Sequence, residues 1–94
     1  MLNAITVRGN VSAEGERTAG HNFKVLKMST GKYAVTFDRD FPETPSVVVT
    51  IIGDEWRLVD NAHVHAIGTD RVIVTTGDYY GQYGDRPFSF IATA

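Results

Sequence analysis

Apolar and polar residues alternate along much of this chain, which is the pattern expected of strands with one buried face. The clearest case lies at 32–37, where Tyr33, Val35 and Phe37 occupy every second position. In contrast, 46–52 is an almost unbroken run of β-branched residues, which predicts a strand that is covered on both faces. Two such strands joined by a short link favour an antiparallel sandwich or barrel.

Turn-forming residues separate these segments from further short strands. Pro42 and Pro45 lie in the polar link between the two strands, and proline has no N–H to donate to a central ladder. Gly31 lies in a turn and is able to adopt positive φ there. The polar segment 12–22 contains two glycines, so a loop is expected. Further strands are expected at 5–11, 23–28, 63–67, 71–76 and 88–93.

The spacing of these elements predicts the fold class. No segment shows the sustained 3.6-residue period of an amphipathic helix, so an all-β fold is expected. About six to seven short strands separated by turns are typical of an antiparallel β-sandwich. With 94 residues, we expect a single domain over 1–94, in which 1–22 is partly a loop or a mobile N-terminal segment.

Size and composition limit how such a domain is stabilised. A chain this short buries only about 60–65% of its unfolded surface. It contains no cysteine, so no disulfide supplements the core. Oligomerisation or a bound metal are the usual remaining means, and the apolar strands favour oligomerisation.

Charge and hydropathy exclude several classes of function. The net charge of −2 argues against a general nucleic-acid or anionic-membrane binder, since such proteins are normally basic. The N-terminal residues lack the apolar core of a signal peptide, and no later segment is long enough to insert into a membrane. No serine lies in a nucleophile elbow and no pair of carboxylates converges, so we expect no enzyme and no cofactor.

His63 and His65 are the first candidate site. Residues two apart in a strand share a face, so both imidazoles could reach one metal ion, and in a trimer the pairs of all protomers could meet around the axis. The alternative is that both face solvent or an interface while Val64 and Ala66 are buried. Because no cysteine or acidic ligand stands at a recognisable spacing, we expect no metal here.

The glycine- and tyrosine-rich loop at 77–86 is the strongest candidate for ligand binding. Tyrosine combines a large apolar face with a polar tip, which suits the C–H faces and hydroxyls of sugars. The alternative is that the tyrosines pack on the same subunit or on a neighbour. The third candidate site is Trp56 with Arg57, which either contact a sugar or cover one end of the sandwich. The candidate residues are Asp78, Tyr79, Tyr80, Gln82, Tyr83, Asp85 and Arg86 in the loop, and Trp56 and Arg57 in the pair.

Several segments together resemble two related groups of β-sandwich proteins. One group is the small domains at the C-termini of phage tail fibres and bacterial surface proteins, and the other is the H-type lectins. Such domains are six- or seven-stranded homotrimers without catalysis, and H-type lectins bind sugars such as N-acetylgalactosamine between protomers. Phe90 stands where the closing lectin strand often carries tryptophan, so the sugar specificity does not carry over. The segments that carry the resemblance are GKYAVTF at 31–37, Phe41, Pro45, VVVT at 47–50, TDRVIV at 69–74 and FSFIA at 88–92.

The resemblance implies a non-catalytic attachment or oligomerisation module, assembled as a homotrimer. It would bind a cell-surface glycan or a partner at the tip of a phage fibre or a bacterial surface assembly. Its location would be the virion or the bacterial cell surface, reached without a signal peptide of its own. A free-standing lectin is one alternative. A purely structural trimer-nucleating cap or particle decoration protein with no external ligand is the other.

Overall fold

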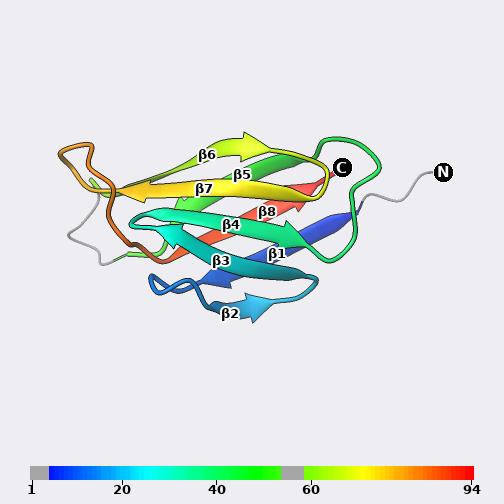
Figure 1. Cartoon of the computed structure of the whole chain (residues 1–94), viewed down its shortest axis with the longest axis horizontal. Coiled ribbons are helices and arrows are strands. Elements are labelled where there is room, and N and C mark those ends of the chain that lie inside the picture. The colour runs from blue at the N-terminus through cyan, green and yellow to red at the C-terminus, as the bar shows by residue number, and fades with distance from the viewer. Residues whose placement is uncertain (1–4, 54–58) are drawn as a thin grey trace.

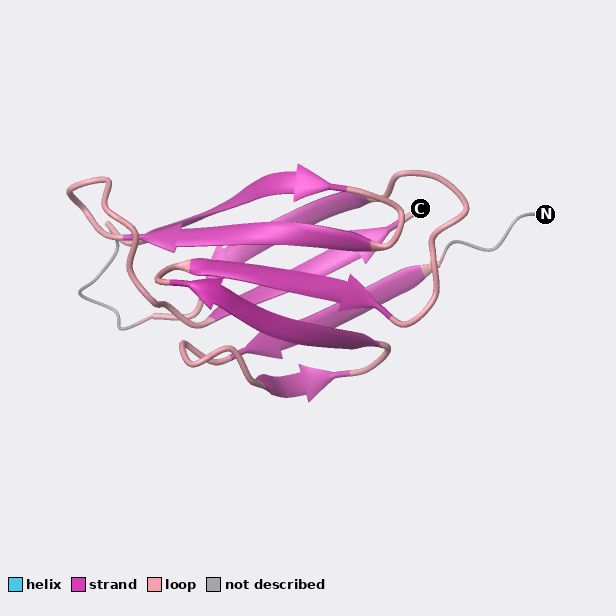
Figure 2. Ribbon diagram, viewed as in Figure 1, coloured by secondary structure: helices cyan, strands magenta, loops and turns pink. Residues whose placement is uncertain are grey.

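The computed structural model describes residues 5–53 and 59–94 of the chain. Its strands form two antiparallel four-stranded sheets, in the orders β2-β1-β8-β5 and β3-β4-β7-β6 (Figures 1 and 2). The predicted all-β class is confirmed, and the two sheets pack face to face in a sandwich-like arrangement. No helix among these residues is long and apolar enough to cross a membrane. The strands are β1 (Thr6–Val11), β2 (Arg17–Gly20), β3 (Phe23–Ser29), β4 (Lys32–Phe37), β5 (Ser46–Ile51), β6 (Asn61–Ile67), β7 (Arg71–Gly77) and β8 (Phe88–Thr93).

The prediction of six to seven strands is wrong because β2 lies in the segment that was expected to be a loop. β2 pairs with β1 at the edge of its sheet, where Gly20 lies opposite Gly9. A Cβ at Gly9 would lie 2.2 Å from the ring of Phe23, so the absence of a side chain allows this close approach. β2 has no alternating pattern of its own, and its pairing with β1 makes it a strand.

The core lies between the two sheets and contains the residues that alternation places inward. Tyr33, Val35 and Phe37 are all buried, as predicted. Aromatic rings from opposite sheets meet edge to face, with centroids 5.0 Å apart for Phe23 and Phe90. Such pairs stabilise a small core by about 0.5–1.5 kcal/mol beyond the area they bury. The buried cluster comprises Val7, Val11, Phe23, Tyr33, Val35, Phe37, Phe41, Val72, Val74, Phe88, Phe90 and Ala92.

β5 differs from its prediction as a strand covered on both faces. It lies at the edge of its sheet and pairs with β8 alone. Val47 and Val49 pack against the core, whereas Val48 points outward and is 65% exposed. β-Branched residues favour a strand wherever it lies, so they predict the element but not its position in the sheet.

Candidate functional site

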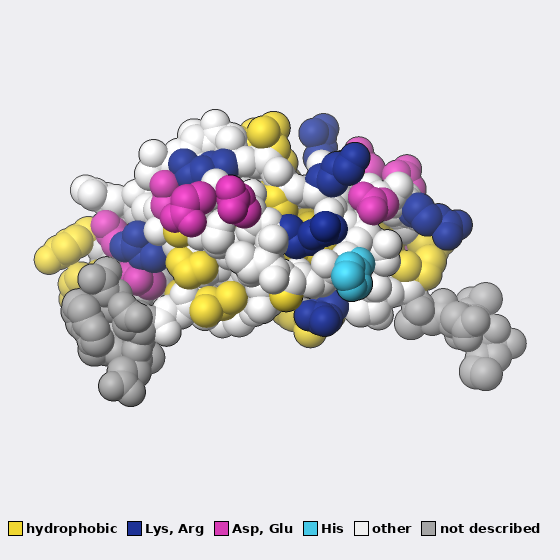
Figure 3. Space-filling view, turned by 90° about the horizontal axis from the view of Figure 1, so that it is seen from below, with side chains coloured by type: hydrophobic (Ala, Val, Ile, Leu, Met, Phe, Trp, Pro, Cys, Tyr) yellow, Lys and Arg dark blue, Asp and Glu magenta, His cyan; other side chains and the backbone are white. Residues whose placement is uncertain are grey.

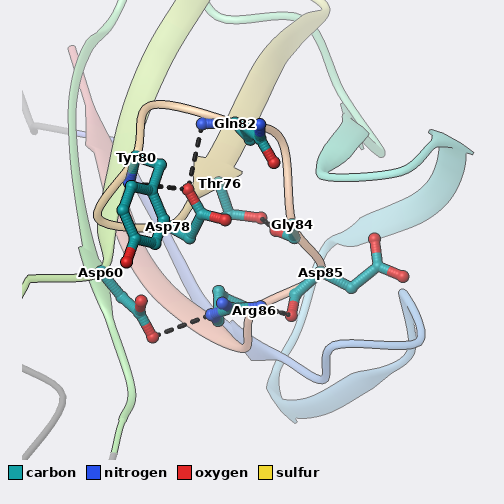
Figure 4. Close-up of polar contacts among 8 residues, drawn as sticks. All are labelled: Asp60, Thr76, Asp78, Tyr80, Gln82, Gly84, Asp85 and Arg86. Carbon is teal, nitrogen blue, oxygen red and sulfur yellow. Dashed lines mark hydrogen bonds and ion pairs between the residues drawn. The ribbon is translucent and has the colours of Figure 1, made fainter.

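The loop from 78 to 87, between β7 and β8, is shaped by the side chain of Asp78 (Figure 4). Asp78 Oδ1 accepts hydrogen bonds from the backbone N–H groups of Tyr80 at 2.9 Å and Gln82 at 3.0 Å. The N–H of Asp78 in turn donates to the carbonyl of Gln82 at 3.0 Å. Gly81 completes the turn at φ 77°. Asp78 therefore bonds to the tip of the loop through both its side chain and its backbone.

The base of the loop is tied to the sheet β3-β4-β7-β6. The hydroxyl of Thr76 donates to the carbonyl of Gly84 at 2.6 Å, and Thr76 is almost fully buried. Asp85 Oδ1 accepts a 2.7 Å hydrogen bond from the N–H of Gly31, and its Oδ2 lies 3.2 Å from Lys27 Nζ. The bond from Gly31, followed by the bond from Lys27, lowers the pKa of Asp85.

Arg86 connects the end of the loop to the residue before β6. Its Nε donates to Asp60 Oδ2 at 2.8 Å, and its Nη1 donates to the carbonyl of Asp85 at 2.9 Å (Figure 4). The Asp60 side chain is only 7% exposed, so the ion pair is largely shielded from water. Arg86 is therefore a structural residue of the loop, as Asp78 and Asp85 are.

The three loop tyrosines differ from these residues because their side chains are exposed. The exposed fractions are 67% for Tyr79, 81% for Tyr80 and 62% for Tyr83. The rings of Tyr79 and Tyr80 contact each other edge to face, with centroids 5.2 Å apart. Tyr33, in contrast, is fully buried and donates its hydroxyl to the carbonyl of Ala13 at 2.7 Å. The loop thus presents aromatic rings to solvent on a backbone that many hydrogen bonds hold.

A hollow of about 360 Å³ lies beside the loop and brings the two main predicted features together. His63 and His65 line one side of it, and Gln82 and Tyr83 of the loop line another. The pairing register of β6 with β7 shifts between Val64 and Ala66. His63 and His65, the neighbours of Val64 in the sequence, both line the hollow. The remaining lining residues are Asn61, Thr75, Thr76, Gly77 and Gly81.

The structure places the predicted site residues in three groups. His63, His65, Gln82 and Tyr83 surround one hollow, and the other two tyrosines lie at the loop tip. Asp78, Asp85 and Arg86 bond to groups of the chain itself. Trp56 and Arg57 lie outside the described residues. Sequence reasoning missed Asn61 and Thr75, which strand pairing places in the hollow, and only the register would have identified them.

A metal ion at the hollow would need acidic, histidine or cysteine ligands besides His63 and His65. In the part of the chain that the structure describes, no group of three such side chains could hold a metal ion. A structural zinc site needs four protein ligands, and a catalytic one needs three. The polar groups around the hollow are better suited to hydrogen bonding with a ligand.

A second hollow, of about 250 Å³, lies on the outer face of the other sheet and was not predicted. Arg8, Ile91 and Val48 stand opposite one another there on β1, β8 and β5. Ile91 is 48% exposed and Val48 is 65% exposed. This face combines an exposed apolar pair with polar neighbours.

Fold and site together define an all-β domain with a hydrogen-bonded aromatic loop above a polar hollow. Comparison of the chain with protein-family models, with curated protein sequences and with solved structures gave no match in any of the three. The function must therefore be inferred from the chemistry of the site.

Proposed function

We propose that this chain is a non-catalytic attachment module that binds carbohydrate through the loop at 78–86. The observation that carries the proposal is the exposure of three tyrosine rings on a loop whose backbone is hydrogen-bonded at its tip and its base. An ordered loop loses little conformational entropy on binding, so more of the contact energy becomes affinity. Tyr79, Tyr80 and Tyr83 each offer an aromatic face for the C–H groups of a sugar ring.

The hollow beside the tyrosines supplies partners for sugar hydroxyl groups. Gln82 and Asn61 each carry an amide that both donates and accepts, and Thr75 adds a hydroxyl. His63 and His65 add ring nitrogens of either kind. An aromatic ring next to several hydrogen-bond donors and acceptors is the combination that binds a saccharide. Asp78, Asp85 and Arg86 contribute by holding the loop, which revises their predicted role as direct hydroxyl partners.

We further propose that the module acts as a homotrimer at the tip of a phage fibre or a bacterial surface assembly. The exposed pair of Val48 and Ile91 supports self-association, because apolar side chains that are neighbours on a sheet face favour burial against another surface. The resemblance to fibre and H-type lectin domains supports the trimeric state and the surface location. Sedimentation equilibrium at micromolar concentration tests the trimer, and a monomer would contradict it.

A glycan array read with the wild-type protein and with a Tyr79→Ala, Tyr80→Ala, Tyr83→Ala triple variant tests the binding function. We expect signals for the wild type that the triple variant loses while its far-UV circular dichroism spectrum is unchanged. An assembled wild type that binds no glycan would favour the alternative, a trimer-nucleating cap or particle decoration protein without an external ligand.

A further inference from the structure

The outer face of the sheet β3-β4-β7-β6 is basic, although the chain as a whole is not. The inward residues of these strands belong to the core, so alternation places their neighbours outward. Strand pairing puts Lys32, Thr75 and His63 in one outward row across three strands. A parallel row farther along the strands contains Lys24, Thr36 and Arg71. None of the residues of these four strands carries a carboxylate.

This distribution does not follow from composition. The chain has 11 acidic and 9 basic residues, for a net charge of −2. Viewed from the side of β2 and β3, acidic and basic side chains lie next to one another (Figure 3). Lys27, which belongs to β3 but points the other way, is paired with Asp85. The basic side chains of this face therefore stand on strands without a carboxylate of their own, in a protein that is negative overall, and the nearest carboxylates adjoin the strand ends.

The basic row leads into the hollow beside the tyrosine loop. Thr75 and His63 line the hollow, and Lys32 stands directly opposite Thr75 on the next strand. Directly opposed residues on neighbouring strands have Cβ atoms about 4.5–5.5 Å apart, so the lysine lies within side-chain reach of the rim. His65 and Tyr83 complete that side of the hollow. Two imidazoles thus line a space that an exposed tyrosine ring borders, and Lys32 stands next to one of its lining residues.

We propose that this hollow binds an anionic glycan, that is, a saccharide that carries carboxylate or sulfate groups. The proposal rests on the carbohydrate-binding function proposed above and specifies its ligand class. The sugar ring packs against Tyr83, and its anionic group receives hydrogen bonds from His63, His65 and Lys32. Charge-assisted hydrogen bonds of this kind are about twice as strong as neutral ones, so the anionic group distinguishes such glycans from neutral ones.

The charged groups near the hollow are of both signs. Lys32 stands beside Thr75 on the next strand. Asp78 in the loop accepts two backbone hydrogen bonds at its Oδ1, and Asp60, directly before β6, is paired with Arg86. Both carboxylates are thus engaged by groups of the chain itself.

Isothermal titration calorimetry with three matched trisaccharides tests the proposal. The probes are trigalacturonic acid, a neutral galactose trisaccharide and the same galactose trisaccharide carrying a 6-sulfate. We expect one or both anionic probes to bind about tenfold more tightly than the neutral probe. The preference also shrinks as salt is raised, because screening weakens exposed charges. Which anionic probe prevails identifies the group as a carboxylate or a sulfate.

Variants assign the effect to the hollow. His63→Gln with His65→Gln, and separately Lys32→Gln, each reduce the preference for the anionic probe over the neutral one. Arg39→Gln removes the same charge from the exposed link before β5 and leaves the affinity unchanged. Equal affinity of the wild type for neutral and anionic probes would overturn this inference and leave the carbohydrate-binding function intact. Binding of none of the three probes would overturn both.

Discussion

The carboxylate of Asp85 accepts a 2.7 Å hydrogen bond from the N–H of Gly31, which lies 54 positions earlier in the chain. The carbonyl of Gly31 accepts a 2.8 Å bond from the N–H of Thr76, the last residue but one of β7. The turn between β3 and β4 is thereby fastened to both ends of the region that supports the tyrosine loop. The conformation of the proposed binding loop therefore depends on backbone groups of the turn between β3 and β4.

Gly31→Ala tests this dependence. Gly31 has φ 67°, and a Cβ there would lie 2.5 Å from the carbonyl oxygen of Thr76 and 2.8 Å from the nitrogen of Gly84. We expect a loss of about 1–3 kcal/mol in the free energy of unfolding, measured by urea denaturation, together with weaker glycan binding. Gly81→Ala is the matched control, because Gly81 also has positive φ but a Cβ there would meet no atom within 4 Å. Equal losses of unfolding free energy for the two variants would contradict the close-contact explanation.

Arg86→Met tests the ion pair at the end of the loop. The substitution leaves the carboxylate of Asp60, 7% exposed, without its guanidinium partner. Loss of one partner of a buried pair costs about 3–5 kcal/mol, so we expect a large drop in the denaturant midpoint. Asp60→Asn in the same chain should recover much of that loss.

Lys27→Met is the control for the buried ion pair. Lys27 also pairs with a carboxylate, that of Asp85, but the two side chains are 30% and 38% exposed. An exposed pair of this kind contributes about 0–1 kcal/mol. If Lys27→Met and Arg86→Met were equally destabilising, burial of the Asp60 carboxylate would not explain the effect.

The buried position of Tyr33 leads us to expect that the protein loses stability in alkaline solution. Burial, with a further contribution from the negative charge of Asp85, raises the pKa of Tyr33 above its ordinary value. A raised pKa in the folded state means that the folded protein holds this proton more tightly than the unfolded chain. The resulting stabilisation is complete below the unfolded pKa of about 10 and is lost as pH rises toward the folded pKa.

Thermal unfolding between about pH 8 and pH 11 measures the effect of Tyr33. We expect Tyr33→Phe to be about 1 kcal/mol less stable near neutrality, since it lacks the 2.7 Å bond to Ala13. The variant should also lose less stability than the wild type above about pH 10. Tyr83→Phe, at an exposed position, should keep the wild-type slope. Parallel slopes for Tyr33→Phe and the wild type would contradict the assignment.

Single alanine substitutions at Tyr79, Tyr80 and Tyr83 separate binding from packing. We expect a loss of about 1–3 kcal/mol in glycan binding at whichever tyrosine is the anchor. The free energy of unfolding should change by about 0.5 kcal/mol or less, because the side chains are exposed. If the variants dissociated or unfolded while the remaining folded protein kept its affinity, the tyrosines would be interface residues. The site would then be sought near Trp56 and Arg57.

The sequence alone determined the strands that have one buried face. Alternation of apolar and polar residues identified β4 and its inward residues Tyr33, Val35 and Phe37, because a period of two is a local property that directly reports one covered face. β8 was identified in the same way. Composition identified the tyrosine loop, since glycine and tyrosine interrupt the alternation of the flanking strands. These features do not depend on what lies across the sheet.

The tertiary structure decided the features that depend on partners distant in the chain. β2 is a strand because β1 offers it an edge, and Val48 is exposed because β5 is itself an edge. The sequence analysis proposed three polar side chains of the loop as ligand contacts, yet each of them bonds to the chain around it. They are Asp78, Asp85 and Arg86. His63 joins Tyr83 only through the pairing of β6 with β7 and the return of the loop. Hydrogen-bond partners and sheet positions are set by contacts between residues that are distant in the chain, and local periodicity does not reveal these contacts.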